Sequence, residues 1–158
     1  VEENLRMAKP DATKEEMEAV LQKVNLLGFL QTQNGLQTGL LEKAGNLSGG
    51  QCQRLVIARA LLRSDSAVYI FDEAASNIDV ESEELIMNVI HELAKTKTVL
   101  LISHRLANVV QSDQIYFLKN GTICERGTHA ELMEQNGAYR HLYDSQMVLE
   151  NYGKQGNA

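Results

Sequence analysis

Two neighbouring carboxylates are the residues of this 158-residue chain best placed to do chemistry. Asp72 and Glu73 directly follow the apolar run Val68 to Phe71, so they lie where a short strand is expected to end. Mg²⁺ takes oxygen ligands and meets proteins through one or two carboxylates together with substrate phosphates and water, a role that suits Asp72. The adjacent Glu73 could then polarise a water molecule in line with a phosphoryl group. Taken alone, the pair is explained equally well as a cap of the following loop or helix.

A second candidate site is the glycine-containing segment Ser48-Gly49-Gly50-Gln51. Two glycines let a phosphate approach the backbone closely, and a helix that begins here presents unpaired N–H groups and the positive end of its dipole to an anion. The Ser48 hydroxyl adds a further donor. When the segment is considered alone, ordinary cap and turn chemistry explains it better.

Two single residues complete the set of candidates. His104 follows the apolar run Thr98 to Ile102 and could donate to a terminal phosphate from the end of a strand. A lone histidine, however, is more often structural. Asp79 is similarly explained by the N-cap of a helix that starts near Val80.

The pattern along the chain predicts the elements that position these residues. Ala67 to Phe71 is a short apolar run, a helix capped by Asp79 follows, and Thr98 to Ile102 is apolar again. Strand, helix and strand in this order imply a parallel sheet with a right-handed crossover, whose ligand chemistry is expected at the carboxyl ends of the strands. Asp72, Glu73 and His104 stand at those ends.

Helices and a hairpin are predicted on either side of this unit. Capping boxes at Thr13/Glu16, Ser48/Gln51 and Thr128/Glu131 each predict a helix start. The turn Asn120-Gly121 between two β-prone runs predicts a hairpin, and a last helix is expected over Ala138 to Leu149.

Composition excludes several classes of function. The formal charge of −6 and the pI near 5.2 argue against a large surface for nucleic acid, whose binding depends on neutralising phosphates. Cys52 and Cys124 lie far apart without metal-ligand spacing, which fits a reducing cytoplasm. No apolar run approaches the roughly 18 residues of a spanning helix.

In their order and spacing, these segments together resemble the ATP-binding domain of ABC transporters. The matching motifs are the signature with its helix (Leu47 to Gln51, Gln53-Arg54 and 58–62), the Walker B strand (Val68 to Glu73), the D-loop (Ser76 to Asp79) and the switch histidine (Ser103-His104). The resemblance covers about Val1 to Tyr143. It is greatest for the exporter-type domains that are fused to membrane spans.

The resemblance implies an α/β fold. Residues 48–150 would form the C-terminal part of a P-loop NTPase (RecA-like) core, with parallel strands, flanking helices and a C-terminal β-hairpin. Residues 1–47 would belong to an α-helical subdomain, and residues 151–158 would form a flexible tail.

The resemblance also implies ATP and Mg²⁺ as ligands and gives each candidate residue a role. Asp72 would hold magnesium through water, Glu73 would be the general base, and His104 would contact the γ-phosphate. The ATP held by the opposite subunit of a head-to-tail dimer would be bound by Ser48, Gly49, Gly50 and Gln51. Asp79 would connect the two active sites.

The implied partners are a second ATPase domain and the transmembrane domain of a transporter. The location implied is the cytoplasmic face of a bacterial membrane, with no nucleic acid bound and no membrane insertion by this segment.

One motif of the family is missing from the sequence. The phosphate-binding loop needs Gly, four residues, Gly-Lys and then Ser or Thr, but the only Gly-Lys pair here is Gly153-Lys154, followed by Gln155. Because that loop lies N-terminal to the signature in this family, we expect a chain that begins in mid-domain and is inactive as an ATPase by itself. A sheet without the missing strands would expose an edge or a face that normally packs.

Two other functions remain as alternatives. Soluble ABC-type ATPases that act on DNA or ribosomes share these motifs, but those acting on DNA carry long coiled coils or zinc-binding cysteines, which this sequence lacks. A non-catalytic half that lends only its signature to a partner is the second alternative, against which Glu73 and His104 argue.

Overall fold

The computed structural model describes residues 1–155 and shows the α/β class that the sequence predicts. The chain forms two compact units, Val1–Ile102 and a second unit from Ser103 onward, and each is described by itself. Within residues 1–155, no helix combines the length and apolar character needed to cross a membrane.

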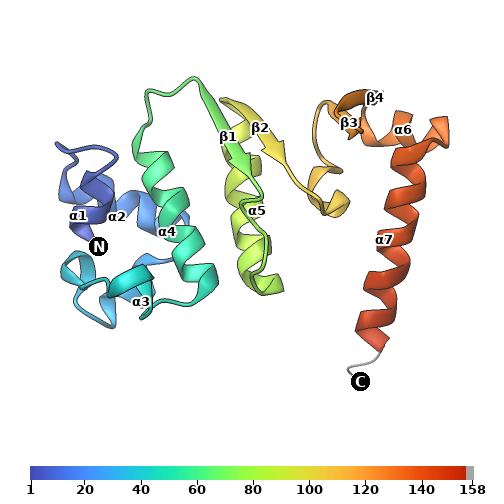
Figure 1. Ribbon diagram of the computed structural model, residues 1–158. Coiled ribbons are helices and arrows are strands. Elements are labelled where there is room, and N and C mark those ends of the chain that lie inside the picture. Colours follow the sequence, from blue (N-terminus) through green and yellow to red (C-terminus); the bar gives the residue numbers. More distant parts are fainter. Residues whose placement is uncertain (156–158) are drawn as a thin grey trace. The chain divides into compact units, whose positions relative to one another are not determined.

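The first part of unit 1 is helical. It contains the short helices α1 (Glu2–Arg6) and α3 (Leu27–Gln31), the longer α2 (Lys14–Lys23) and α4 (Gly49–Leu62), and two 3₁₀ turns, η1 (Gly35–Gln37) and η2 (Glu42–Ala44). Helices α1 and α2 contact α4, and α3 contacts α2 and η1 (Figure 1). The predicted capping box at Thr13 and Glu16 is confirmed, with both reciprocal hydrogen bonds present. Apolar side chains one helical turn apart, among them Met17, Leu21 and Val24, are almost fully buried.

The second part of unit 1 is the predicted strand, helix and strand. Strands β1 (Val68–Asp72) and β2 (Thr98–Ile102) pair in parallel, and α5 (Val80–Ala94) connects them. The predicted first strand, 67–71, is thus shifted by one residue, so that Asp72 ends β1 and is part of it. Helix α5 lies behind the strand pair in Figure 1 and buries Ile86 and Ile90 in the core of the unit.

The strand pair is apolar on both faces, but only one face is covered. Tyr69 and Phe71 point into the core, whereas Val68, Ile70, Leu100 and Ile102 are between 46% and 65% exposed. The structure thus buries only every second residue of β1. Each strand pairs with the other alone among the described residues. This agrees with the expectation of an exposed face and edge.

Unit 2 is built around the predicted hairpin. Strands β3 (Ile115–Lys119) and β4 (Thr122–Gly127) pair antiparallel across the Asn120-Gly121 turn, and the turn η3 (Leu106–Val109) precedes them. Helix α6 (His129–Gln135) starts with the predicted capping box of Thr128 and Glu131. The last helix, α7 (Ala138–Gln155), overlaps the tail expected over 151–158, of which residues 156–158 lie outside the described part of the chain.

A carboxylate of the hairpin caps α7. Glu125 of β4 accepts hydrogen bonds from the backbone amides of Ala138, at 2.5 Å, and Tyr139, at 3.0 Å. A Cβ on Gly137 would lie 2.5 Å from Oε1 of the same carboxylate. The first turn of α7 therefore requires the Glu125 carboxylate as its cap and glycine at position 137, where a side chain would collide with that carboxylate.

This cap leads to a prediction about stability. Glu125→Ala leaves two amides at a helix start without their acceptor, so we expect the free energy of unfolding to fall by about 2 kcal/mol. Urea unfolding followed by circular dichroism measures the loss. The matched control is Glu134→Ala, at an exposed position of α6, which is expected to change little. Equal losses in the two variants would contradict the capping role.

Candidate functional site

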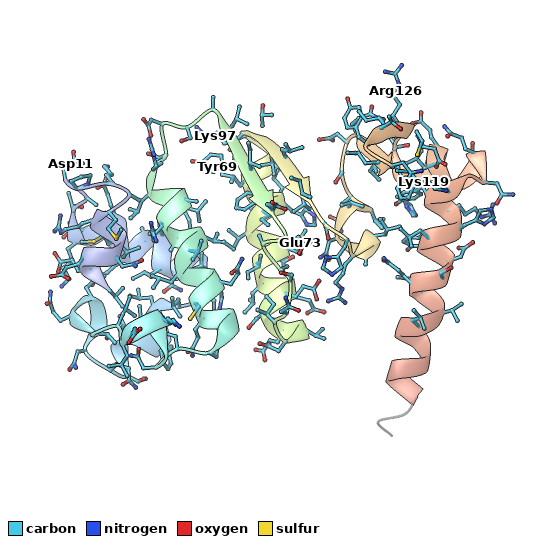
Figure 2. The ribbon with its side chains drawn as sticks, viewed as in Figure 1. Asp11, Tyr69, Glu73, Lys97, Lys119 and Arg126 are labelled. Carbon is cyan, nitrogen blue, oxygen red and sulfur yellow. The ribbon has the colours of Figure 1, made fainter. Side chains whose placement is uncertain are left out.

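The carboxylate pair stands at the carboxyl end of β1, as the sequence predicts. Asp72 is the last residue of the strand and pairs with Ile102, while the Glu73 amide donates to the Ile102 carbonyl at 2.9 Å. Glu73 has a φ of 49°, in the left-handed region that few non-glycine residues adopt. Both side chains are exposed, and Figure 2 shows Glu73 just past the end of β1.

The left-handed residue explains how the two carboxylates come to differ in position. In a continuing strand, successive side chains would point to opposite faces of the sheet. At Glu73 the chain instead leaves the strand in a tight turn, closed by the Ser76 amide donating to the Glu73 carbonyl at 3.0 Å. Backbone strain of this kind is concentrated at functional sites. The turn therefore sets Asp72 on the sheet and Glu73 on the loop that leads to α5.

The segment Ser48 to Gln51 forms the start of α4. The Gln51 amide donates to Ser48 Oγ at 3.2 Å, and the Ser48 amide donates to Gln51 Oε1 at 2.9 Å, which confirms the predicted reciprocal cap. This cap uses the backbone amides of Ser48 and Gln51 as donors. The Ser48 O–H proton and the Gln51 side-chain NH₂ group take no part in it and could donate to a ligand. The amides of Gly49 and Gly50 belong to the first turn, where the helix provides no acceptor. Of these donors, those of Ser48 and Gly49 belong to exposed residues that an anion could reach, whereas Gly50 is buried.

The two glycines of this segment have different surroundings. Gly49 is exposed, and a Cβ there would make only ordinary contacts, 3.9 Å from Cγ2 of Ile78 and 4.0 Å from the Asn77 carbonyl oxygen. Gly50 is buried, and a Cβ there would lie 2.2 Å from Oγ and 2.6 Å from Cβ of Ser82. The sequence led us to expect that both glycines make room for phosphate. In the structure, the atoms next to Gly50 belong to α5 of the same chain.

Asp79 caps α5, as predicted, and its carboxylate lies beside the start of α4. Its Oδ1 accepts the Ser82 amide at 2.8 Å, and its Oδ2 is 3.2 Å from where a Cβ of Gly50 would be. Hydrogen bonds from the Ser82 amide and hydroxyl lower the pKa of the Asp79 carboxyl group below its usual value. Asp79 is therefore held as a carboxylate between the first turns of two helices.

His104 belongs to unit 2, where its backbone is held in a turn. The Ser103 hydroxyl bonds both the amide and the carbonyl of Arg105, each at 3.0 Å. From α7, the Gln146 side chain donates to the His104 carbonyl at 2.7 Å and accepts the Leu106 amide at 2.9 Å. The His104 side chain is exposed.

Known proteins are similar to this chain over most of its length. A family model described as ABC transporter matches residues 1–76. An ABC transporter ATP-binding protein of Haemophilus influenzae is 51% identical over 99% of this chain and 28% of its own length. An ATP-dependent lipid A-core flippase of Mannheimia succiniciproducens is 46% identical over 88% of this chain and 24% of its own length.

A solved structure of a bacterial Atm1-family ABC exporter with ATP bound superposes with a TM-score of 0.83 and 29% identity, over 92% of this chain and 25% of that one. The chain belongs to the ABC transporter ATP-binding domain family. Its α/β fold is accordingly part of the P-loop NTPase core, with the parallel strands, helices and antiparallel hairpin that the resemblance implies. This ABC domain sequence spans about a quarter of the length of the relatives that it matches.

In this ABC domain, seven of the eight predicted site residues lie in unit 1. They are the signature segment Ser48, Gly49, Gly50 and Gln51, the carboxylates Asp72 and Glu73, and Asp79. Asp79 and Gly50 come into direct proximity, which the sequence did not predict. No group of three or more His, Cys, Asp and Glu side chains is placed to hold a metal within residues 1–155.

Sequence reasoning missed two residues that hold the ABC motifs in place. Gln146 fixes the backbone on both sides of His104, and Ser82 touches both Gly50 and Asp79. Neither belongs to a recognised motif. Ser82 could have been noticed as the third residue after the Asp79 cap, where the first capped amide is expected. For Gln146, 42 residues from His104, no local signal exists.

Proposed function

We propose that this chain is part of the ATP-hydrolysing domain of a bacterial ABC exporter, and that it couples hydrolysis to transport across the membrane. The observation that carries the proposal is the exporter-type structure: the chain follows the ATP-bound Atm1-family exporter over 92% of its length. Named relatives include lipid A-core flippases and a multidrug export ATP-binding/permease protein of Staphylococcus aureus. Soluble ATPases that act on DNA or ribosomes remain the alternative, which no feature of this structure favours.

The proposed chemistry is attack of water on the γ-phosphorus of ATP. Glu73 accepts a proton from the water as the new P–O bond forms, and the bond from phosphorus to the ADP oxygen breaks. Asp72 is an exposed carboxylate at a strand end, which suits magnesium, and that ion would neutralise charge on the phosphates. The exposed imidazole of His104 is assigned to the γ-phosphate.

The signature segment would act on a second nucleotide. At the start of α4, Ser48, Gly49, Gly50 and Gln51 would bind the phosphates of the ATP held by a second ATPase domain in a head-to-tail dimer. Asp79 would connect the two sites through its position between α4 and α5. A transmembrane domain would receive the resulting motion at the cytoplasmic face. Residues 1–47 would belong to an α-helical subdomain, residues 48–150 to the ATPase core and residues 151–158 to a C-terminal tail.

A chimeric transporter tests this function. The matching segment of the Haemophilus influenzae relative is replaced by this chain, and ATPase activity is measured in detergent or lipid. We expect turnover that depends on magnesium, and none from the isolated 158-residue chain, which has no phosphate-binding loop motif. A folded chimera that binds ATP without hydrolysing it would overturn the catalytic assignment. Stimulation by DNA or ribosomes would favour the alternative.

A further inference from the structure

The buried glycine of the signature segment faces its own chain. A Cβ on Gly50 would lie 2.6 Å from the Cβ of Ser82, and a rotation of the Ser82 side chain cannot relieve this contact. Ser82 is 5% exposed and sits in the first turn of α5, so it cannot move away without the helix. Any side chain at position 50 must therefore push the two helix starts apart.

The contact of Gly50 at the start of α4 with Ser82 at the start of α5, called the joint below, is supported by neighbouring contacts. Ser82 is tied to Asp79 by its backbone amide, and Gly49 lies against Ile78 and Asn77 of the loop that ends in this cap. Arg54 donates to the Gly50 carbonyl at 3.3 Å and to the Asn25 carbonyl at 3.0 Å, which ties the first turn of α4 to the end of α2. The start of α4 thus lies between α5 and the helical part of unit 1.

We infer that Ser82 is a positioning residue that fixes the start of α4 on the start of α5, and that position 50 is glycine because Ser82 occupies the space of its side chain. The packing itself does not depend on the proposed function, but its consequence for ATP hydrolysis does. There, the start of α4 binds one nucleotide, and the loop from Glu73 to Asp79 serves another. A closely packed joint makes these two groups move as one body.

A compensating pair of substitutions tests the joint in the 158-residue chain. Gly50→Ala should lower the melting temperature by several degrees, because a methyl group is forced into a filled space. Adding Ser82→Gly removes both clashing atoms, and G50A/S82G should recover at least half of the loss. G50A/S82A keeps the clashing Cβ and should recover less. The control G50A/N88G places a glycine at an exposed position of α5 and should recover nothing.

The chimeric transporter tests the consequence, at a temperature well below the melting of every variant. Gly50→Ala should reduce kcat/KM about tenfold or more, and G50A/S82G should return it to within about threefold of the parent. Additive losses in the melting assay would overturn the inference, because Ser82 would then not be the residue that excludes a side chain at position 50. Recovery of melting without recovery of kcat/KM would overturn its consequence, because glycine would then be needed by the nucleotide. An inactive parent chimera would count against the proposed function alone, since the melting experiment still decides the joint.

Discussion

Replacing Glu73 by glutamine in the chimeric transporter is expected to lower kcat at least a hundredfold while ATP binding is retained. A positioned general base contributes roughly 10² to 10⁴ in rate, and glutamine keeps the size of the side chain but cannot take a proton. Asp72 is untouched, so the magnesium-dependent affinity should stay within a few-fold. Single-turnover hydrolysis and equilibrium binding of ATP separate the two effects.

The matched control for this substitution is Glu84→Gln. Glu84 is an exposed glutamate of α5, and the same change of charge there should leave kcat unaltered. Because Glu73 has left-handed backbone geometry, thermal melting of both variants must also be compared. If the glutamine variant at 73 turned over at the parental rate, Glu73 would not be the base. A parallel loss of ATP binding would instead assign it to the phosphates or to magnesium.

The sequence predicted best those features that depend on residues a few positions apart. Three capping boxes, the Asp79 cap and the Asn120-Gly121 hairpin were all confirmed, because each is a short-range hydrogen-bond pattern that a few residue types satisfy. The parallel pairing of β1 and β2 also followed, since a helix between two apolar runs permits little else.

Contacts between distant segments could not be predicted in the same way. The apolar residues of β1 run without alternation, so the sequence could not indicate that Ile70 is exposed while Phe71 is buried. The cap of α7 by Glu125 joins a strand to a helix, and the contact of Gly50 with Ser82 joins two helix starts. These contacts are determined by packing, for which a single sequence has no local pattern.

The contrast between the two glycines carries a last prediction, for Gly49→Asp in the chimeric transporter. A Cβ at position 49 has no neighbour closer than 3.9 Å, so the side chain fits, and a carboxylate in the first turn of a helix is favourable by roughly 0.3 to 1 kcal/mol. Stability should therefore be kept or slightly raised. ATPase activity should fall on the order of a hundredfold, because the new carboxylate takes the donors meant for phosphate and repels it.

Gly49→Asp should thus lose activity but keep its stability, whereas Gly50→Ala should lose both. The isosteric control Gly49→Asn carries no charge, so its activity should lie between those of the parent and the aspartate variant. Raising the salt concentration should recover part of the aspartate variant's activity, since screening weakens repulsion at an exposed site. Normal ATPase activity in Gly49→Asp, with the fold intact, would mean that the start of α4 does not meet a nucleotide, and the assignment of Ser48 to Gln51 would be wrong.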